Sequence, residues 1–112
     1  MKTRQPASED LLFEVLTPLG FRVRVTKRYW QLIVNVKHPV MLGQEEKIKQ
    51  ALKSPEEIRQ SLRDRGVYLF YTSERLGRWV CAVARHEKDV EGFLITAYPT
   101  DAIKEGEKIW PR

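Results

Sequence analysis

The sequence predicts an α+β fold, an antiparallel sheet of about four to five strands with two to three helices on one face. Three observations lead to this prediction. Apolar and polar residues alternate over residues 21–25, as in a half-buried strand. Apolar residues then recur at helical spacing over residues 29–36. Short polar links join three β-rich stretches within residues 67–98, as in an antiparallel meander.

Two strands are predicted at the start of the folded region. Residues 11–16 are mostly apolar, and Thr17-Pro18-Leu19-Gly20 behind them is a turn signal. In the next strand, residues 21–25, the apolar side chains are expected to face the core. Arg22 and Arg24 then share a basic outer face, because side chains alternate along a strand.

Helices are predicted to follow these strands. The first must end at His38, because Pro39 disfavours helical backbone in the residue before it. A second helix is expected from about residue 43 to residue 53. Ser54-Pro55-Glu56-Glu57 offers a capping serine, a proline suited to the first helical position and a glutamate that completes a capping box. This motif predicts a third, short helix.

The second half of the chain reads mainly as strands, at residues 67–72, 78–85 and 92–98. In the last strand, strict alternation would turn Phe93, Ile95 and Ala97 toward the core and Leu94, Thr96 and Tyr98 to the opposite face. A hydroxyl and a phenol would then lie near the strand end that Pro99 enforces. Residues 101–110 give no clear pattern beyond a final helical turn and an extended tail.

Length and composition limit the class of protein. A chain of 112 residues, 42% hydrophobic and 31% charged, predicts one globular domain at residues 11–112 after a flexible tail at residues 1–10. The single cysteine, Cys81, excludes an internal disulfide and fits the cytoplasm. No apolar run has the ~20 residues of a membrane helix. The net charge of +5 favours an anionic partner such as nucleic acid, although it can also serve solubility alone.

His38 is the first candidate for chemistry. A histidine at the end of a helix can act as a general acid or base near neutral pH, or it can simply cap the helix dipole. The carboxylates are scattered and no metal-ligand spacing is present, so neither a metal nor another cofactor is expected. His86 reads as a surface residue and Cys81 as a small buried side chain.

Basic and aromatic residues are interleaved along the chain. Arg22 and Arg24 share one strand, Arg59 and Arg63 lie one turn apart in the predicted third helix, and aromatic residues such as Tyr71 follow. Arginines that bind phosphate and rings that stack on bases are typical of proteins that bind unpaired RNA. A core with a solvated basic rim would give the same composition.

Several stretches resemble the RelE-like toxins of the barnase–EndoU–colicin–RelE group of small ribonucleases. Residues 21–26 followed by a helix are similar to the start of the RelE-like core. Lys37-His38-Pro39, the stretch from Ser54 to Ser61 and the stretch from Phe93 to Tyr98 resemble a bacterial and phage branch of that group. The resemblance implies a RelE-like fold. It also implies the catalytic set His38, Arg59, Thr96 and Tyr98, and Arg63, Tyr71 and Lys104 as further contacts to RNA.

The activity implied by the resemblance is metal-independent cleavage of RNA by attack of a 2′-hydroxyl on the adjacent phosphate. The resemblance leaves open whether the substrate is ribosome-bound RNA or tRNA, and whether an antitoxin protein is a partner. One alternative is a non-catalytic module on the same fold that binds RNA or protein, since a fold does not fix a function. Another is a structural or interaction protein whose positive charge is incidental.

Overall fold

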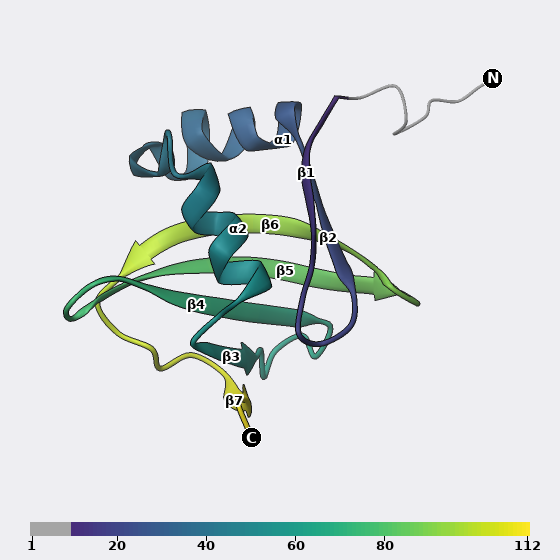
Figure 1. Ribbon diagram of the computed structural model, residues 1–112, viewed down its shortest axis with the longest axis vertical. Helices are drawn as coiled ribbons and strands as arrows, with labels where there is room; N and C mark the ends of the chain where they lie inside the picture. The colour runs from purple at the N-terminus through teal and green to yellow at the C-terminus, as the bar shows by residue number, and fades with distance from the viewer. Residues whose placement is uncertain (1–9) are drawn as a thin grey trace.

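A mixed sheet of seven strands forms the body of the computed structural model, which describes residues 10–112 (Figure 1). The sheet order is β1-β2-β6-β5-β4-β3-β7. The strands are β1 (Leu11–Leu16), β2 (Arg22–Thr26), β3 (Glu57–Gln60), β4 (Val67–Arg75), β5 (Arg78–Lys88), β6 (Glu91–Thr100) and β7 (Glu107–Trp110). The helical segments are α1 (Lys27–Leu32), the π-helical η2 (Ile33–Lys37), the 3-10 turn η3 (Pro39–Met41) and α2 (Glu45–Lys53).

The predicted fold class is wrong. Instead of four to five antiparallel strands carrying two to three helices in a RelE-like arrangement, the structure is dominated by its sheet. The β1–β2 hairpin joins the sheet beside β6, and β2 runs parallel to β6. The sheet is therefore mixed. The two α-helices in residues 10–112 are short, at 6 and 9 residues.

The predicted third helix is strand β3. The capping motif around Pro55 is overridden by pairing with β4 on one side and β7 on the other. The backbone N–H of Glu56 donates to the carbonyl of Tyr71 at 2.7 Å, and the Glu56 carboxylate accepts the backbone N–H of Ser73 at 2.9 Å. Ile58 is fully buried in the sheet. Burial and strand pairing therefore outweigh a local propensity worth about 1 kcal/mol.

Strand β6 departs from strict alternation through a β-bulge at Ile95. Thr96 pairs with Val83, but Leu94 pairs with the next residue of β5, Ala84. Leu94 therefore lies in the core, and Phe93 is 38% exposed, so both predicted orientations were wrong. Ala97 is buried as predicted. The bulge changes the phase of the alternation once, within the strand.

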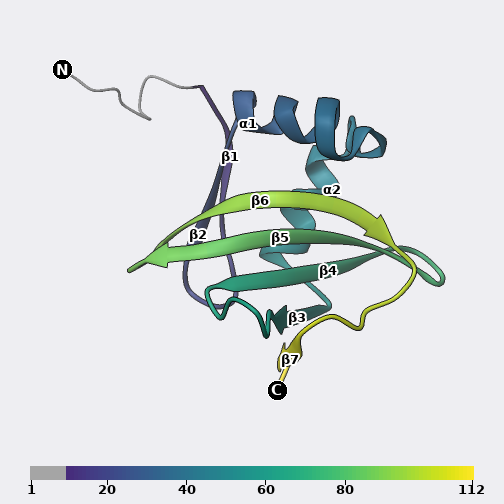
Figure 2. The same ribbon diagram turned by 180° about the vertical axis from the view of Figure 1, so that it is seen from behind.

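The two faces of the sheet differ. Helix α2 lies across one face, over the main core (Figure 1). Seen from behind, the opposite face of the sheet has no helix in front of it, and we call it the helix-free face (Figure 2). This face carries a smaller cluster around Leu69, Tyr71 and Cys81. After β6 the chain passes β5 and β4 to reach β7 beside β3, and Ile103 from this segment packs on that cluster.

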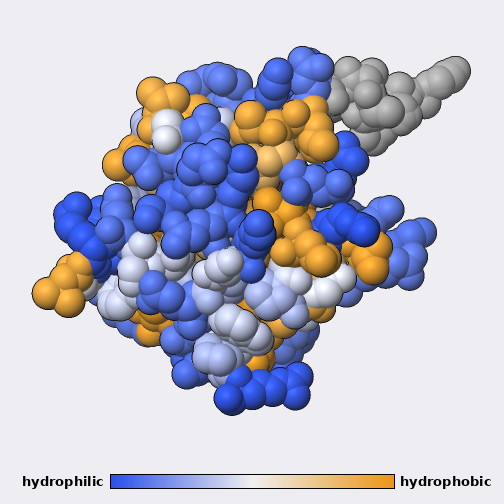
Figure 3. All heavy atoms as spheres, viewed as in Figure 1, coloured by the Kyte–Doolittle hydropathy of each residue, from blue (hydrophilic) through white to orange (hydrophobic). Residues whose placement is uncertain are grey.

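The helical region ends where the sequence predicted. The backbone of His38 is extended, with φ −145° and ψ 80°, and its N–H donates to the carbonyl of Ile33 at 2.7 Å. On the helix-bearing face, hydrophilic side chains cover α2, and hydrophobic atoms gather along β1 and, in a smaller patch, at the end of the helical region (Figure 3). The exposed apolar residues of that region are Leu32, Val36, Val40 and Leu42.

Two predictions concern the chain as a whole. The predicted flexible tail lies outside the described residues except for Asp10. Within residues 10–112, no helix has the length and apolar character needed to cross a membrane.

Candidate functional site

A cavity of about 570 Å³ opens on the helix-free face, and we call it the histidine groove. It brings together five of the nine residues predicted for the site: His38, Tyr71, Thr96, Tyr98 and Lys104. The rest of its wall is Thr100, Asp101, Ala102 and Glu105. Four segments meet here: the end of the helical region, strand β4, strand β6 and the segment 101–106 that follows β6.

His38 is held in the groove by the helix end and by an aromatic neighbour. Its backbone carbonyl accepts the N–H of Met41 at 2.9 Å, which fixes the turn into η3. Its half-buried ring lies with its centroid 5.6 Å from that of Tyr98, at an interplanar angle of 45°. This separation is within the usual range for interacting aromatic rings. The imidazole therefore projects from a defined backbone into the groove.

Tyr98 and Tyr71 flank Cys81 in one row across three strands, since Cys81 pairs with Tyr71 on β4 and with Tyr98 on β6. Burial raises the pKa of both phenols well above 10.0. Both therefore stay protonated at neutral pH and can donate hydrogen bonds, but they are poor bases. Tyr71 is only 2% exposed, which leaves little ring surface for stacking on a base.

Thr96 contributes an unpaired hydroxyl to the groove. Its Oγ1 is buried and has no hydrogen-bond partner in residues 10–112. A buried hydroxyl without a partner costs about 1–3 kcal/mol. Such a group on a cavity wall is suited to a hydrogen bond with a bound molecule.

Arg59 does not join the groove. It lies in the same cross-strand row as Thr96, but Leu69 and Val83 stand between them, a separation of about 14 Å at normal strand spacing. Its Nη1 donates to the carbonyl of Ile103 at 3.2 Å, and its Nε lies 3.4 Å from Glu57 Oε2 without hydrogen-bond geometry. Arg59 thus fastens the segment 101–106 onto the sheet.

The other predicted arginines lie elsewhere. Arg22 and Arg24 are exposed on β2, and Arg24 lines a separate cavity with Glu87, Glu91 and Phe93. Arg63 lines a cavity of about 460 Å³, called here the loop pocket, which shares Tyr98 and Glu105 with the histidine groove. The structure therefore places one predicted arginine beside the groove and leaves three apart from it.

Sequence reasoning missed the two carboxylates of the groove, Asp101 and Glu105. The Tyr98 hydroxyl donates to Glu105 Oε1 at 3.4 Å. Residues 101–110 have neither helical nor strand periodicity, so no local signal placed these side chains. In the part of the chain that the structure describes, no group of three or more histidine, cysteine or acidic residues could hold a metal.

The site can thus be described from its geometry: an open groove with an imidazole, an ammonium, an unpaired hydroxyl, two carboxylates and two protonated phenols. The resemblance to RelE-like toxins remains a prediction. Comparison of the chain with protein-family models, with curated proteins and with solved structures finds no match.

Proposed function

We propose that this chain is a metal-independent endoribonuclease that cleaves RNA by attack of a 2′-hydroxyl on the adjacent phosphate. One observation carries the proposal: a single open groove holds the imidazole of His38, the hydroxyl of Thr96 and the amine of Lys104. Transesterification of RNA needs proton transfer, a hydrogen bond to a phosphate oxygen and positive charge, and these three groups can supply them.

Each residue has a role that follows from its position. His38 makes one of the two proton transfers, either from the 2′-oxygen as the O–P bond forms or to the 5′-oxygen as its bond to phosphorus breaks. Lys104 stabilises the charge of the phosphorane, a role that Arg59 cannot take while it is bound to Glu57 and Ile103. Thr96 donates to a phosphate oxygen, and the protonated Tyr98 offers a ring for base stacking and a hydrogen-bond donor.

The test is RNA cleavage by the parent protein, by His38→Ala and by the matched control His86→Ala. His86 is the other histidine of the chain, and its ring stacks on Phe21 with centroids 4.6 Å apart. We expect His38→Ala to fold and to cleave about 10²–10⁴ times more slowly, as is typical when a general acid or base is removed. We expect folded His86→Ala to keep the parent rate.

The products test the chemistry independently. Cleavage should survive a chelator and leave 2′,3′-cyclic phosphate ends, and RNA with 2′-deoxyribose at the cut site should resist. Equal rates for His38→Ala and the parent would remove His38 from the mechanism. A parent protein that binds RNA but cleaves none, with or without ribosomes, would favour the non-catalytic RNA-binding module.

A further inference from the structure

The loop pocket adjoins the histidine groove, and both cavities share Tyr98 and Glu105. Its volume is about 460 Å³, within the range of small-molecule sites. Its apolar lining includes Val67, Leu69 and Val83 from β4 and β5. A nucleotide next to one bound in the groove would place its base over this apolar surface.

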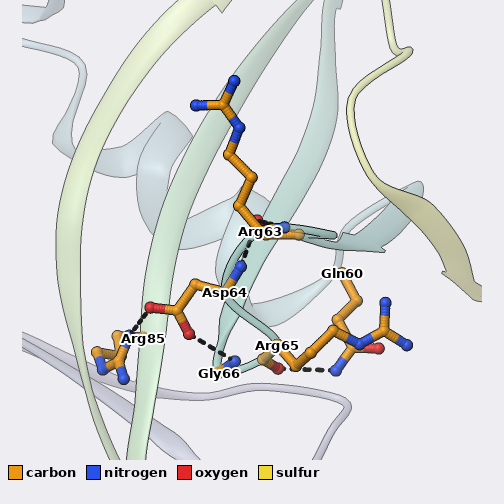
Figure 4. Close-up of polar contacts among 7 residues, drawn as sticks. Gln60, Arg63, Asp64, Arg65, Gly66 and Arg85 are labelled. Carbon is orange, nitrogen blue, oxygen red and sulfur yellow. Dashed lines mark hydrogen bonds and ion pairs between the residues drawn. The ribbon is translucent and has the colours of Figure 1, made fainter.

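Arg63 lines the pocket from a loop that several hydrogen bonds hold in place, and Figure 4 shows its polar contacts. The Ser61 hydroxyl accepts the backbone N–H groups of Arg63 and Asp64, at 3.2 and 3.3 Å. The Asp64 carboxylate accepts the N–H of Gly66 at 3.0 Å and pairs with Arg85. The Arg63 side chain projects away from this network (Figure 4), and its guanidinium has no ion pair or hydrogen bond in residues 10–112. Its donors are therefore available on a fixed backbone.

Glu105 supplies acceptors to the same pocket. Its side chain is exposed, and its one hydrogen bond in residues 10–112 is the 3.4 Å contact with Tyr98, which is long for an O–H···O bond. A carboxylate has lone pairs for about four hydrogen bonds, so most of its capacity is unused. The pocket thus combines an apolar lining with the unpaired guanidinium of Arg63 as donor and the carboxylate of Glu105 as acceptor.

We propose that the loop pocket binds a guanine base of single-stranded RNA beside the cleavage site, an inference that rests on the proposed ribonuclease function. Guanine alone among the four bases has two adjacent N–H donors, N1–H and N2–H, on its Watson–Crick edge, and they match the two oxygens of Glu105. Its O6 and N7 acceptors match the guanidinium of Arg63. The apolar lining receives the flat face of the ring.

Binding of non-cleavable RNA tests the pocket separately from catalysis. The probes are 2′-O-methyl dinucleotides that differ in one base, measured by calorimetry with the full chain. We expect the guanine form to bind about tenfold or more tightly than the others, as for a good bidentate contact. Glu105→Gln should abolish the preference, because an amide offers one acceptor and one donor group. Glu46→Gln, with the same charge change on α2, should keep it.

Arg63 has its own matched control. Arg63→Ala should weaken binding of the guanine dinucleotide about fivefold or more, whereas Arg28→Ala, on an exposed position of α1, should not. Equal affinity for all four bases, or a guanine preference that survives Glu105→Gln, overturns the inference. RNA cleavage without base preference overturns only the guanine pocket. Guanine-selective binding without any cleavage supports the pocket and overturns the ribonuclease.

Discussion

Cys81 is the most deeply buried titratable residue on the helix-free face, with no exposed surface. Burial raises the pKa of its thiol from 9.0 to about 12, against the smaller opposing effect of hydrogen bonds to Tyr98 and Tyr71. The same burial raises the pKa of both phenols. The row beneath the groove is therefore neutral at physiological pH, so the charged side chains of the segment 101–106 carry the electrostatics of the groove.

This row predicts a loss of stability at alkaline pH. The folded protein keeps the Cys81 proton that the unfolded chain releases above pH 9, so the free energy of unfolding falls as pH rises from about 9 toward 12. The fall from this one proton should approach about 1.4 kcal/mol per pH unit. Urea unfolding at about pH 8 and about pH 10 should give a shallower decline for Cys81→Ala than for the parent. Identical declines would contradict the assigned pKa.

At the scale of elements, the bulge in β6 decides which side chains reach the site. Ile95, at the bulge, has its carbonyl held by the Tyr29 hydroxyl at 2.6 Å and by Lys37 Nζ at 3.1 Å. The end of the helical region and the middle of β6 are thereby tied together. Lys37 precedes His38 and Ile95 precedes Thr96, so these hydrogen bonds fix the two sides of the groove relative to each other.

A pair of substitutions tests the bulge. Leu94 is 1% exposed, so Leu94→Ala should lower the free energy of unfolding by about 2–5 kcal/mol. Phe93 is 38% exposed, so Phe93→Ala should cost clearly less although it removes a larger side chain. Denaturant unfolding of both variants gives the comparison. A larger loss of stability for Phe93→Ala than for Leu94→Ala would contradict the bulge and indicate strict alternation along β6.

Local signals predicted elements where the pattern is long and unambiguous. The strand at residues 11–16 was predicted from its apolar composition, the strand at residues 67–72 from its aromatic and branched residues, and the helix end at His38 from proline geometry. The capping motif at residues 54–57 failed, because a four-residue segment pairs on both sides and tertiary contacts outweigh its propensity. The β6 bulge adds one residue to an otherwise alternating run, and nothing in the run marks the position.

At the scale of the whole molecule, the groove depends on contacts between residues far apart in sequence. His38, Thr96 and Tyr98 could be proposed individually, but Glu105 enters only because the chain after β6 returns past the sheet to pair β7 with β3. Arg59, proposed as a catalytic residue, instead fastens that returning segment through Ile103. Sequence periodicity shows which face of a single helix or strand is buried. It does not show that the chain after β6 returns past the sheet to β3.

The charge distribution predicts which basic residues control the salt dependence of RNA binding. The chain has a net charge of +5, but Lys104 and Arg63 are the predicted basic residues that line the groove and the loop pocket. For single-stranded RNA, each lost phosphate contact should reduce the log–log slope of affinity against salt by about 0.7. Lys104→Ala should show this reduction. For Arg63, a smaller change is expected if its donors contact the base, as proposed above.

The matched control is the double variant Arg22→Ala/Arg24→Ala, which removes two positive charges from β2, whereas Lys104→Ala removes one from the groove and Arg63→Ala one from the loop pocket. Because Arg24 lines a separate cavity with Glu87 and Glu91, we expect this variant to keep the parent slope. A slope reduced by about 1.4 would mean that RNA extends along β2 and that both arginines contact phosphates. Affinity that does not change with salt in the parent would exclude phosphate contacts altogether, and with them the placement of RNA in the histidine groove.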